Sequence, residues 1–265
     1  MDVDIVNESN EIEDVMLGTL SIEDWIKIET IKSAFVSLSQ LSKPQCPAHF
    51  ESSDRISALA SWSEFVQQVA LRYIDFFRQI TEFQELLIDD RLILIKYNLF
   101  SVFPLGKCYN HQRGNDCCSQ GSCEQSNKHR RFFTVIGDPN GMRGLTQSLI
   151  RSLIEITEQD PTILSLLSII LILSPGLSMN EDEPALNDPL AVNRVQSYYI
   201  ELLWNYLVSE LGEIEACRRF TQLLRVILQL QSSSRTLRTF FRDQYEGRNM
   251  VDSLAPLLQS VLHIY

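Results

Sequence analysis

The side chains with the greatest capacity for chemistry lie together in one short segment of the chain, between residues 106 and 131. Four of the six cysteines stand there with two of the four histidines: Cys108, His111, Cys117, Cys118, Cys123 and His129. Thiolate and imidazole are ligands that zinc prefers, and Cys108 and His111 stand at a spacing that suits one ion. A zinc-binding adaptor held together by Cys108, His111, Cys117 and Cys123 is therefore one hypothesis.

The composition of the same segment favours a simpler interpretation. Residues 106–131 are hydrophilic and have no periodicity, and no two cysteines of the chain stand in a Cys-x-x-Cys pair. We therefore predict a Cys/His-rich loop insertion with incidental cysteines, and we expect no metal or other cofactor. A redox-sensing loop is a further alternative, because exposed thiols can be reactive.

Nothing else in the sequence predicts catalysis. The histidines His49, His111, His129 and His263 stand in predicted loops or near the end of the chain. The sequence has no serine nucleophile elbow, no glycine-rich phosphate loop and no paired catalytic carboxylates. We expect a protein that is not an enzyme.

Charge and hydropathy narrow the class of partner. The formal net charge of -11 and a sequence pI near 4.9 argue against direct contact with nucleic acid or with an anionic membrane. The most apolar stretch, residues 163–173, is too short to span a bilayer and predicts a buried core helix. The acidic start, residues 1–14, does not look like a secretory signal, so we expect an intracellular protein with reduced thiols.

The segments that would position the candidate side chains are predicted to be helices. Residues 1–19 predict an acidic flexible tail, and Ser21 with Asp24 form a capping box that begins a helix. A long connection over residues 41–54 precedes a long helix from residue 56 to about 80. More helical pattern follows to Phe103, where Pro104 and Gly106 are predicted to end it.

The second half of the chain continues the helical pattern after one interruption. Phe132 to Ile136 predicts a short β-strand, closed by a turn over residues 137–141. Helices resume near residue 145 and after Pro161, and Asp188-Pro189 begins another. A long helix from Ile214 to Phe241 and a short amphipathic segment over residues 253–264 complete an all-α pattern.

One stretch combines spaced aromatic, basic and acidic residues with an apolar run: Phe76-Phe77-Arg78-Gln79-Ile80-Thr81-Glu82-Phe83, then Leu86, Asp90 and Leu92–Lys96. It resembles the signature of a known family, the ligand-binding domains of nuclear hormone receptors. Phe77, Thr81 and Arg91 depart from the pattern, but most anchors stand at matching spacing. The order of elements over residues 20–265 is similar too.

The resemblance implies a three-layer antiparallel helical sandwich of about ten to twelve helices with one small β element. It also implies an apolar pocket for a small lipophilic ligand. The lining would come largely from residues of the third helix and the signature region: Trp62, Phe65, Val69, Tyr73, Leu94, Leu99 and Phe103. The same side chains are equally consistent with a filled core.

The resemblance further implies a surface groove for a coregulator helix with an LxxLL-type face. A helix end leaves backbone groups unpaired, so a basic side chain can cap the carbonyl end and an acidic one the N–H end. Arg78 and Lys96 take the basic positions, and Ser260 stands where the family has glutamate. The groove residues implied are Arg78, Phe83, Lys96, Leu257, Leu258, Ser260 and Val261.

The function implied is a ligand-regulated transcription regulator in the nucleus, with a degenerate activation helix. Its partners would include a second nuclear receptor, as a homo- or heterodimer through residues 214–241, where Phe220, Leu224 and Leu228 are candidates. No DNA-binding module is present in this chain. The alternative is a ligand-independent, corepressor-like interaction module with a filled pocket, and losing the charge at Ser260 favours a weakened or repressive role.

Overall fold

The computed structural model describes residues 20–40, 53–111, 131–138, 141–174 and 185–264, and folds them almost entirely into helices. In chain order these are α1 (Ile22–Gln40), α2 (Arg55–Phe77), α3 (Thr81–Gln84), α4 (Ile88–Asn110), α6 (Met142–Thr157), α7 (Pro161–Ile172), α8 (Pro189–Leu211), α9 (Glu213–Glu246), the 3₁₀ turn η2 (Val251–Ser253) and α10 (Pro256–Leu262). No helix in this part of the chain has the length and apolar character needed to cross a membrane.

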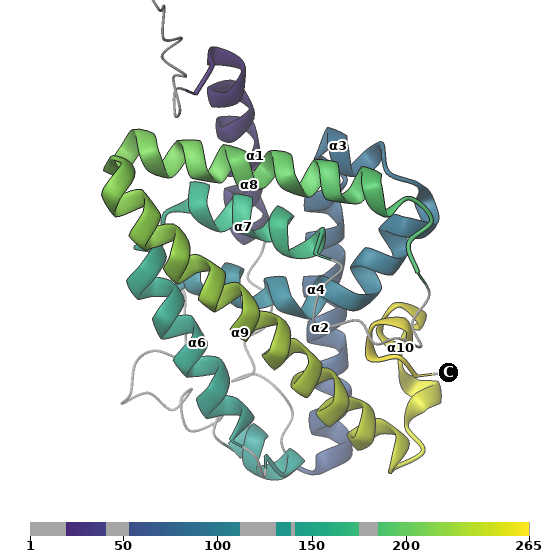
Figure 1. The fold of residues 1–265 in the computed structure, drawn as a ribbon. Helices are drawn as coiled ribbons and strands as arrows, with labels where there is room; N and C mark the ends of the chain where they lie inside the picture. Colours follow the sequence, from purple (N-terminus) through teal and green to yellow (C-terminus); the bar gives the residue numbers. More distant parts are fainter. Residues whose placement is uncertain (1–19, 41–52, 112–130, 139–140, 175–184, 265) are drawn as a thin grey trace, which may run out of the picture.

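The helices are stacked in three layers (Figure 1). α1 and α2 form one outer layer, α4, α7 and α8 lie in the middle, and α6 and α9 form the other outer layer. α10 packs against α2, α4 and α9 at the end of the chain. The predicted all-α, three-layer sandwich is confirmed in its helical part.

The centre of the molecule is α7, which is buried on every side. All residues from Thr162 to Ile172 are buried, as the sequence predicted for this stretch. The Asp160 carboxylate begins the helix, because its Oδ1 accepts from the Thr162 N–H at 2.7 Å. Its other oxygen accepts from the Tyr206 hydroxyl of α8 at 2.7 Å, which ties the start of α7 to its neighbour.

Predicted helix caps begin two further helices. The Ser21 N–H donates to Asp24 Oδ2 and the Asp24 N–H donates back to Ser21 Oγ, both at 3.1 Å, so the capping box of α1 is confirmed. The Asp188 carboxylate accepts from the Ala191 N–H at 2.9 Å and begins α8, with Pro189 in its first turn.

The prediction that Pro104 and Gly106 end a helix is wrong. α4 continues through both to Asn110. The reason is a contact from α2: the Tyr73 hydroxyl donates to the Val102 carbonyl at 2.9 Å and accepts from the Gly106 N–H at 3.0 Å. It therefore inserts between two backbone groups on either side of Pro104, whose missing N–H already interrupts the hydrogen-bond ladder of the helix.

The predicted β-strand at Phe132–Ile136 is also wrong, because residues 131–136 are helical. Phe132 and Ile136 are four residues apart, which places them on one helical face, and both are fully buried. No strand exists among the described residues to pair with this segment. Burial on a helical face therefore overrides the local preference of aromatic and β-branched residues for strands.

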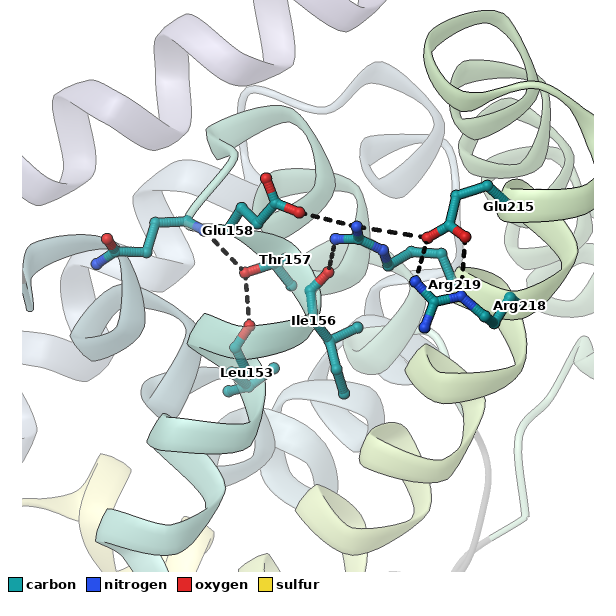
Figure 2. A network of polar contacts seen from close by, with 8 residues as sticks. Leu153, Ile156, Thr157, Glu158, Glu215, Arg218 and Arg219 are labelled. Atoms are coloured by element: carbon teal, nitrogen blue, oxygen red, sulfur yellow. Dashed lines mark hydrogen bonds and ion pairs between the residues drawn. The ribbon is translucent and has the colours of Figure 1, made fainter.

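A polar network joins the end of α6 to the start of α9 (Figure 2). The Arg219 guanidinium donates to the carbonyl of Ile156 and to Glu158 Oε1, the latter at 2.8 Å, and lies 3.7 Å from Glu215. Glu158 has a left-handed backbone with φ of 51°, as does the residue after it. The arginine thus holds the outer layer together where α6 makes a strained turn into α7.

The Tyr73 bridge gives a first test. Removing the hydroxyl in Tyr73→Phe leaves the Gly106 N–H and the Val102 carbonyl without their partner in the core, so we expect the free energy of unfolding to fall by about 1–3 kcal/mol. Urea unfolding of both proteins measures it. Tyr198→Phe is the matched control, because its hydroxyl lies on a half-buried side chain and contacts the side chains of Asp24, at 3.4 Å, and Lys27 rather than backbone groups of a helix. An equal loss in the control would contradict the bridge.

Candidate functional site

A hollow of about 220 Å³ lies on the surface between the first half of α4 and α10. We refer to it as the α4/α10 groove. Most of its lining is apolar, and the residues that line it are Leu92, Ile93, Ile95, Lys96, Leu257, Ser260 and Val261. Leu92 and Lys96 stand one helical turn apart and so share a face of α4. The groove offers apolar surface with one amine and one hydroxyl at its wall.

Four of the seven residues predicted for a coregulator groove meet here: Lys96, Leu257, Ser260 and Val261. The other three lie elsewhere. Phe83 and Leu258 point into the core, with 2% and 0% of their surface exposed. Arg78 follows the end of α2, is largely exposed and lies 3.9 Å from Asp75.

Three lining residues, Leu92, Ile93 and Ile95, were not predicted as groove residues. The sequence carried a signal for them, since all three belong to the apolar run quoted in the family signature. Leu92 keeps 60% of its surface exposed although it is a large apolar side chain in a regular helix. With the half-buried Ile93 and Ile95 it forms a contiguous apolar surface, and such surfaces mark interaction sites.

α10 is fixed in place by contacts within the chain. Leu258, Val261 and Leu262 are buried on its inner side. The Gln259 side-chain amide donates to the carbonyls of Val251 and Leu254, at 3.1 and 3.0 Å, and so ties α10 to the turn before it. The groove wall that α10 supplies is therefore part of the folded core.

The residue after α10 adds an aromatic contact. The His263 ring lies edge-on to the Tyr97 ring of α4, with centroids 4.4 Å apart. The Tyr97 carbonyl accepts from the Arg238 guanidinium of α9, so three elements meet at this point. Burial, together with the positive charges of Arg238 and Lys96, lowers the pKa of His263 to about 3. The imidazole is therefore neutral at physiological pH.

The predicted ligand-pocket residues belong to the hydrophobic core or pack against it. Trp62 stacks on Phe241 with ring centroids 3.5 Å apart, and the centroids of the Trp62 and Phe100 rings lie 6.4 Å apart. Leu94 and Leu99 are fully buried, and Tyr73 is engaged with the backbone of α4. The remaining three, Phe65, Val69 and Phe103, are partly buried and pack against the same core.

The structure separates Cys108 from the predicted loop. Because α4 continues to Asn110, Cys108 lies in a helix, and its thiol is buried 3.8 Å from the Thr157 hydroxyl. Burial raises the pKa of this thiol to about 11, which favours the protonated form over the thiolate that binds metal. Of the other candidate ligands, His111 follows α4, whereas Cys117, Cys118, Cys123 and His129 lie outside the described residues.

The long helix α9 presents part of the surface predicted for dimer formation. Leu224 and Leu228, four residues apart, keep 46% and 54% of their surface exposed. Phe220, the third candidate, is instead partly buried, and its ring lies edge-on to that of Trp204 in α8 with centroids 5.6 Å apart. Two of the three candidates are therefore available to a partner.

Comparison with known proteins identifies a family. The family model described as the ligand-binding domain of nuclear hormone receptor matches residues 54–241, which extends from the residue that caps α2 to the buried Phe241 of α9. No curated protein matches the chain.

His263 makes the docking of α10 sensitive to acid. The pKa of its side chain is 6.5 in an unfolded chain and about 3 in the folded one, so below pH 6.5 the unfolded chain binds a proton that the folded chain does not. The contribution of the His263 side chain to the free energy of unfolding is therefore complete above pH 6.5 and decreases as the pH drops below it. We expect the melting temperature to fall by about 2–4 °C more between pH 7 and 5 in the native protein than in His263→Asn.

Asparagine suits this position because His263 has a left-handed backbone with φ of 57°. Differential scanning fluorimetry across the pH range measures both slopes. The same slope in the two proteins would show that the imidazole titrates normally in the folded state.

Proposed function

The chain belongs to the family of nuclear hormone receptor ligand-binding domains, and from that premise we propose that it regulates transcription by binding a leucine-rich coregulator helix in the α4/α10 groove. Membership ties the chain to ligand binding and to the regulation of transcription. Proteins of this family are generally not enzymes and typically act in the nucleus, which is where we place this one.

The observation that carries the proposal is the composition of the groove wall. Apolar side chains from two helices, Leu92 and Ile93 of α4 with Leu257 and Val261 of α10, line one hollow together with the amine of Lys96. The leucine face of an amphipathic helix would bury its side chains against such a surface. The lysine would meet the unpaired carbonyls at the end of that helix, where the helix dipole favours a cation.

Ser260 sets the strength of this interaction. Its hydroxyl can accept one hydrogen bond from the N–H groups at the other end of the partner helix, but it supplies no charge. Losing the charge-assisted part of that contact weakens binding by about 1–2 kcal/mol, or roughly tenfold. We therefore propose a weakened or repressive form of coregulator binding, which a receptor partner would complement in a heterodimer.

The packing of the core supports the ligand-independent form of the proposal. Trp62, Phe100 and Phe241 occupy the interior from which a pocket would be formed, and Tyr97 and His263 hold α10 from within the chain. A protein built this way would present its groove without a bound molecule. Binding of a small lipophilic ligand remains the alternative, and the exposed Leu224 and Leu228 are the proposed dimer contact.

Charge restoration tests the groove. We expect Ser260→Glu to tighten binding of a fluorescent LxxLL peptide about tenfold, because it adds the missing anion at the N–H end. Lys96→Ala should weaken binding of the same peptide several-fold. Fluorescence anisotropy measures both dissociation constants.

Gln229→Glu is the matched control, since it adds the same charge at an exposed position of α9 and should leave the affinity unchanged. If Ser260→Glu and Gln229→Glu change the affinity equally, the effect comes from net charge and the peptide does not use this groove.

Native mass spectrometry of the protein purified from cells tests the filled core. We expect the native mass to equal that of the chain, because the stacked rings of Trp62 and Phe241 leave no room between them. Trp62→Ala is the comparison variant, because it removes one ring of the stack and should admit an apolar molecule. A lipophilic adduct on the native protein that leaves on denaturation would reject the ligand-independent form and identify the ligand class.

A further inference from the structure

Two arginines from the ends of different helices converge on one uncharged side chain. Arg55 is the first residue of α2, and Arg248 follows the end of α9. The Arg55 guanidinium donates to Oε1 of Gln244 and to the carbonyl of Ile136. Arg248 Nη1 donates to the same Gln244 Oε1 at 3.1 Å and to the Gln244 carbonyl at 3.0 Å. Figure 1 shows the start of α2 and the end of α9 at the same lower edge of the molecule.

No negative charge of the described residues balances this pair. None of the ion pairs found there joins either guanidinium to a carboxylate. The carboxylate of Asp54 is adjacent in sequence, but it accepts from the Ile56 and Ser57 N–H groups and caps α2. Burial lowers the pKa of Arg55, and the charge of Arg248 lowers it further. The two cations therefore repel each other across one amide oxygen.

Hydrogen-bond donors also remain at this place. A guanidinium has five N–H donors, and the Nε of Arg55 is buried without a partner. Leaving a charged donor unsatisfied in the interior is unfavourable unless an acceptor reaches it. Gly137 lies beside the same guanidinium: a Cβ there would lie 3.2 Å from Arg55 Nη2, and its backbone φ is +70°. Arg55 thus lies between three segments of the chain, and its guanidinium keeps a positive charge and an N–H donor that no described residue pairs.

We propose that Arg55 and Arg248 bind an oxyanion, a phosphate or carboxylate group, between them. Such a group would supply both the negative charge and the acceptor oxygens that the pair lacks, and its geometry matches the planar fork of a guanidinium. Two sources share this chemistry: free inorganic phosphate, or the charged head of an apolar molecule. The proposal does not depend on the α4/α10 groove, because none of its residues lines that hollow.

The experiment measures the melting temperature of the full chain against increasing sodium phosphate, with sodium chloride adjusted to keep ionic strength constant. We expect a saturable rise with phosphate, because binding to the folded state alone stabilises it. Arg248→Gln should weaken the apparent phosphate affinity about tenfold, since it removes a charge-assisted contact. Arg248→Lys, which keeps the charge but loses the fork, should fall between the two.

Arg242→Gln is the matched control. It removes one positive charge from the last turns of the same helix, at a residue whose Nε lies 3.8 Å from Asp243, and should leave the phosphate titration unchanged. Parallel titrations with dodecanoate and with phosphate distinguish the two sources. If the site takes the charged head of an apolar molecule, the rise in melting temperature saturates at a much lower concentration of dodecanoate than of phosphate.

Two outcomes overturn the proposal. One is the absence of a saturable rise with either phosphate or dodecanoate in the native protein. The other is an equal response of Arg248→Gln and the native protein, which would place the anion at some other surface.

Discussion

The whole arrangement depends on the burial of α7. A helix with all of its residues from Thr162 to Ile172 inside the molecule has no face to turn toward water, so other helices must cover it on every side. α1, α4 and α8 do so, and α6 and α9 then pack against α4 and α8. The serines within α7 do not disturb this, because the hydroxyls of Ser165 and Ser168 donate to carbonyls one turn earlier. The three layers follow from this one segment.

The groove is a consequence of the same packing. α4 passes through the middle layer, so its later residues are enclosed while its first turns extend to the surface, where Leu92 is exposed. α10 closes against those turns and is held by its own buried leucines and by the contact of His263 with Tyr97. The groove and the core are therefore built from opposite sides of the same two helices, so a change in the packing of α10 would also change the shape of the groove.

Much of the fold was predictable because its signals are local. Capping residues such as Ser21, Asp24 and Asp188 mark where helices begin, and the period of apolar residues marks the buried faces. The two errors have a different origin. The continuation of α4 through Pro104 depends on a tyrosine about thirty residues earlier in the chain, and the helix at Phe132–Ile136 depends on burial against distant segments. In both cases the contacting residues lie far away in the sequence, so the sequence of the segment alone does not reveal them.

The residues of the candidate site also divide into those that the sequence predicts and those that only the packing decides. Lys96, Leu257, Ser260 and Val261 were predicted because the family signature and the C-terminal helix give them positions, and all four line the hollow. Phe83 and Leu258 have the residue types of a groove but are buried in the core, and only the three-dimensional packing distinguishes those outcomes. Cys108 was assigned to the loop because the end of α4 was misplaced, and the thiol lies instead in a buried helical turn.

The bridge between Tyr73 and α4 also constrains how this sequence can evolve. A Cβ on residue 106 would lie 2.7 Å from the Tyr73 hydroxyl oxygen but 3.7 Å from the ring carbon that carries it. Alanine at position 106 therefore clashes while the tyrosine is present and fits once phenylalanine has replaced it. The two positions form an epistatic pair, in which the effect of alanine at position 106 depends on whether residue 73 carries a hydroxyl group.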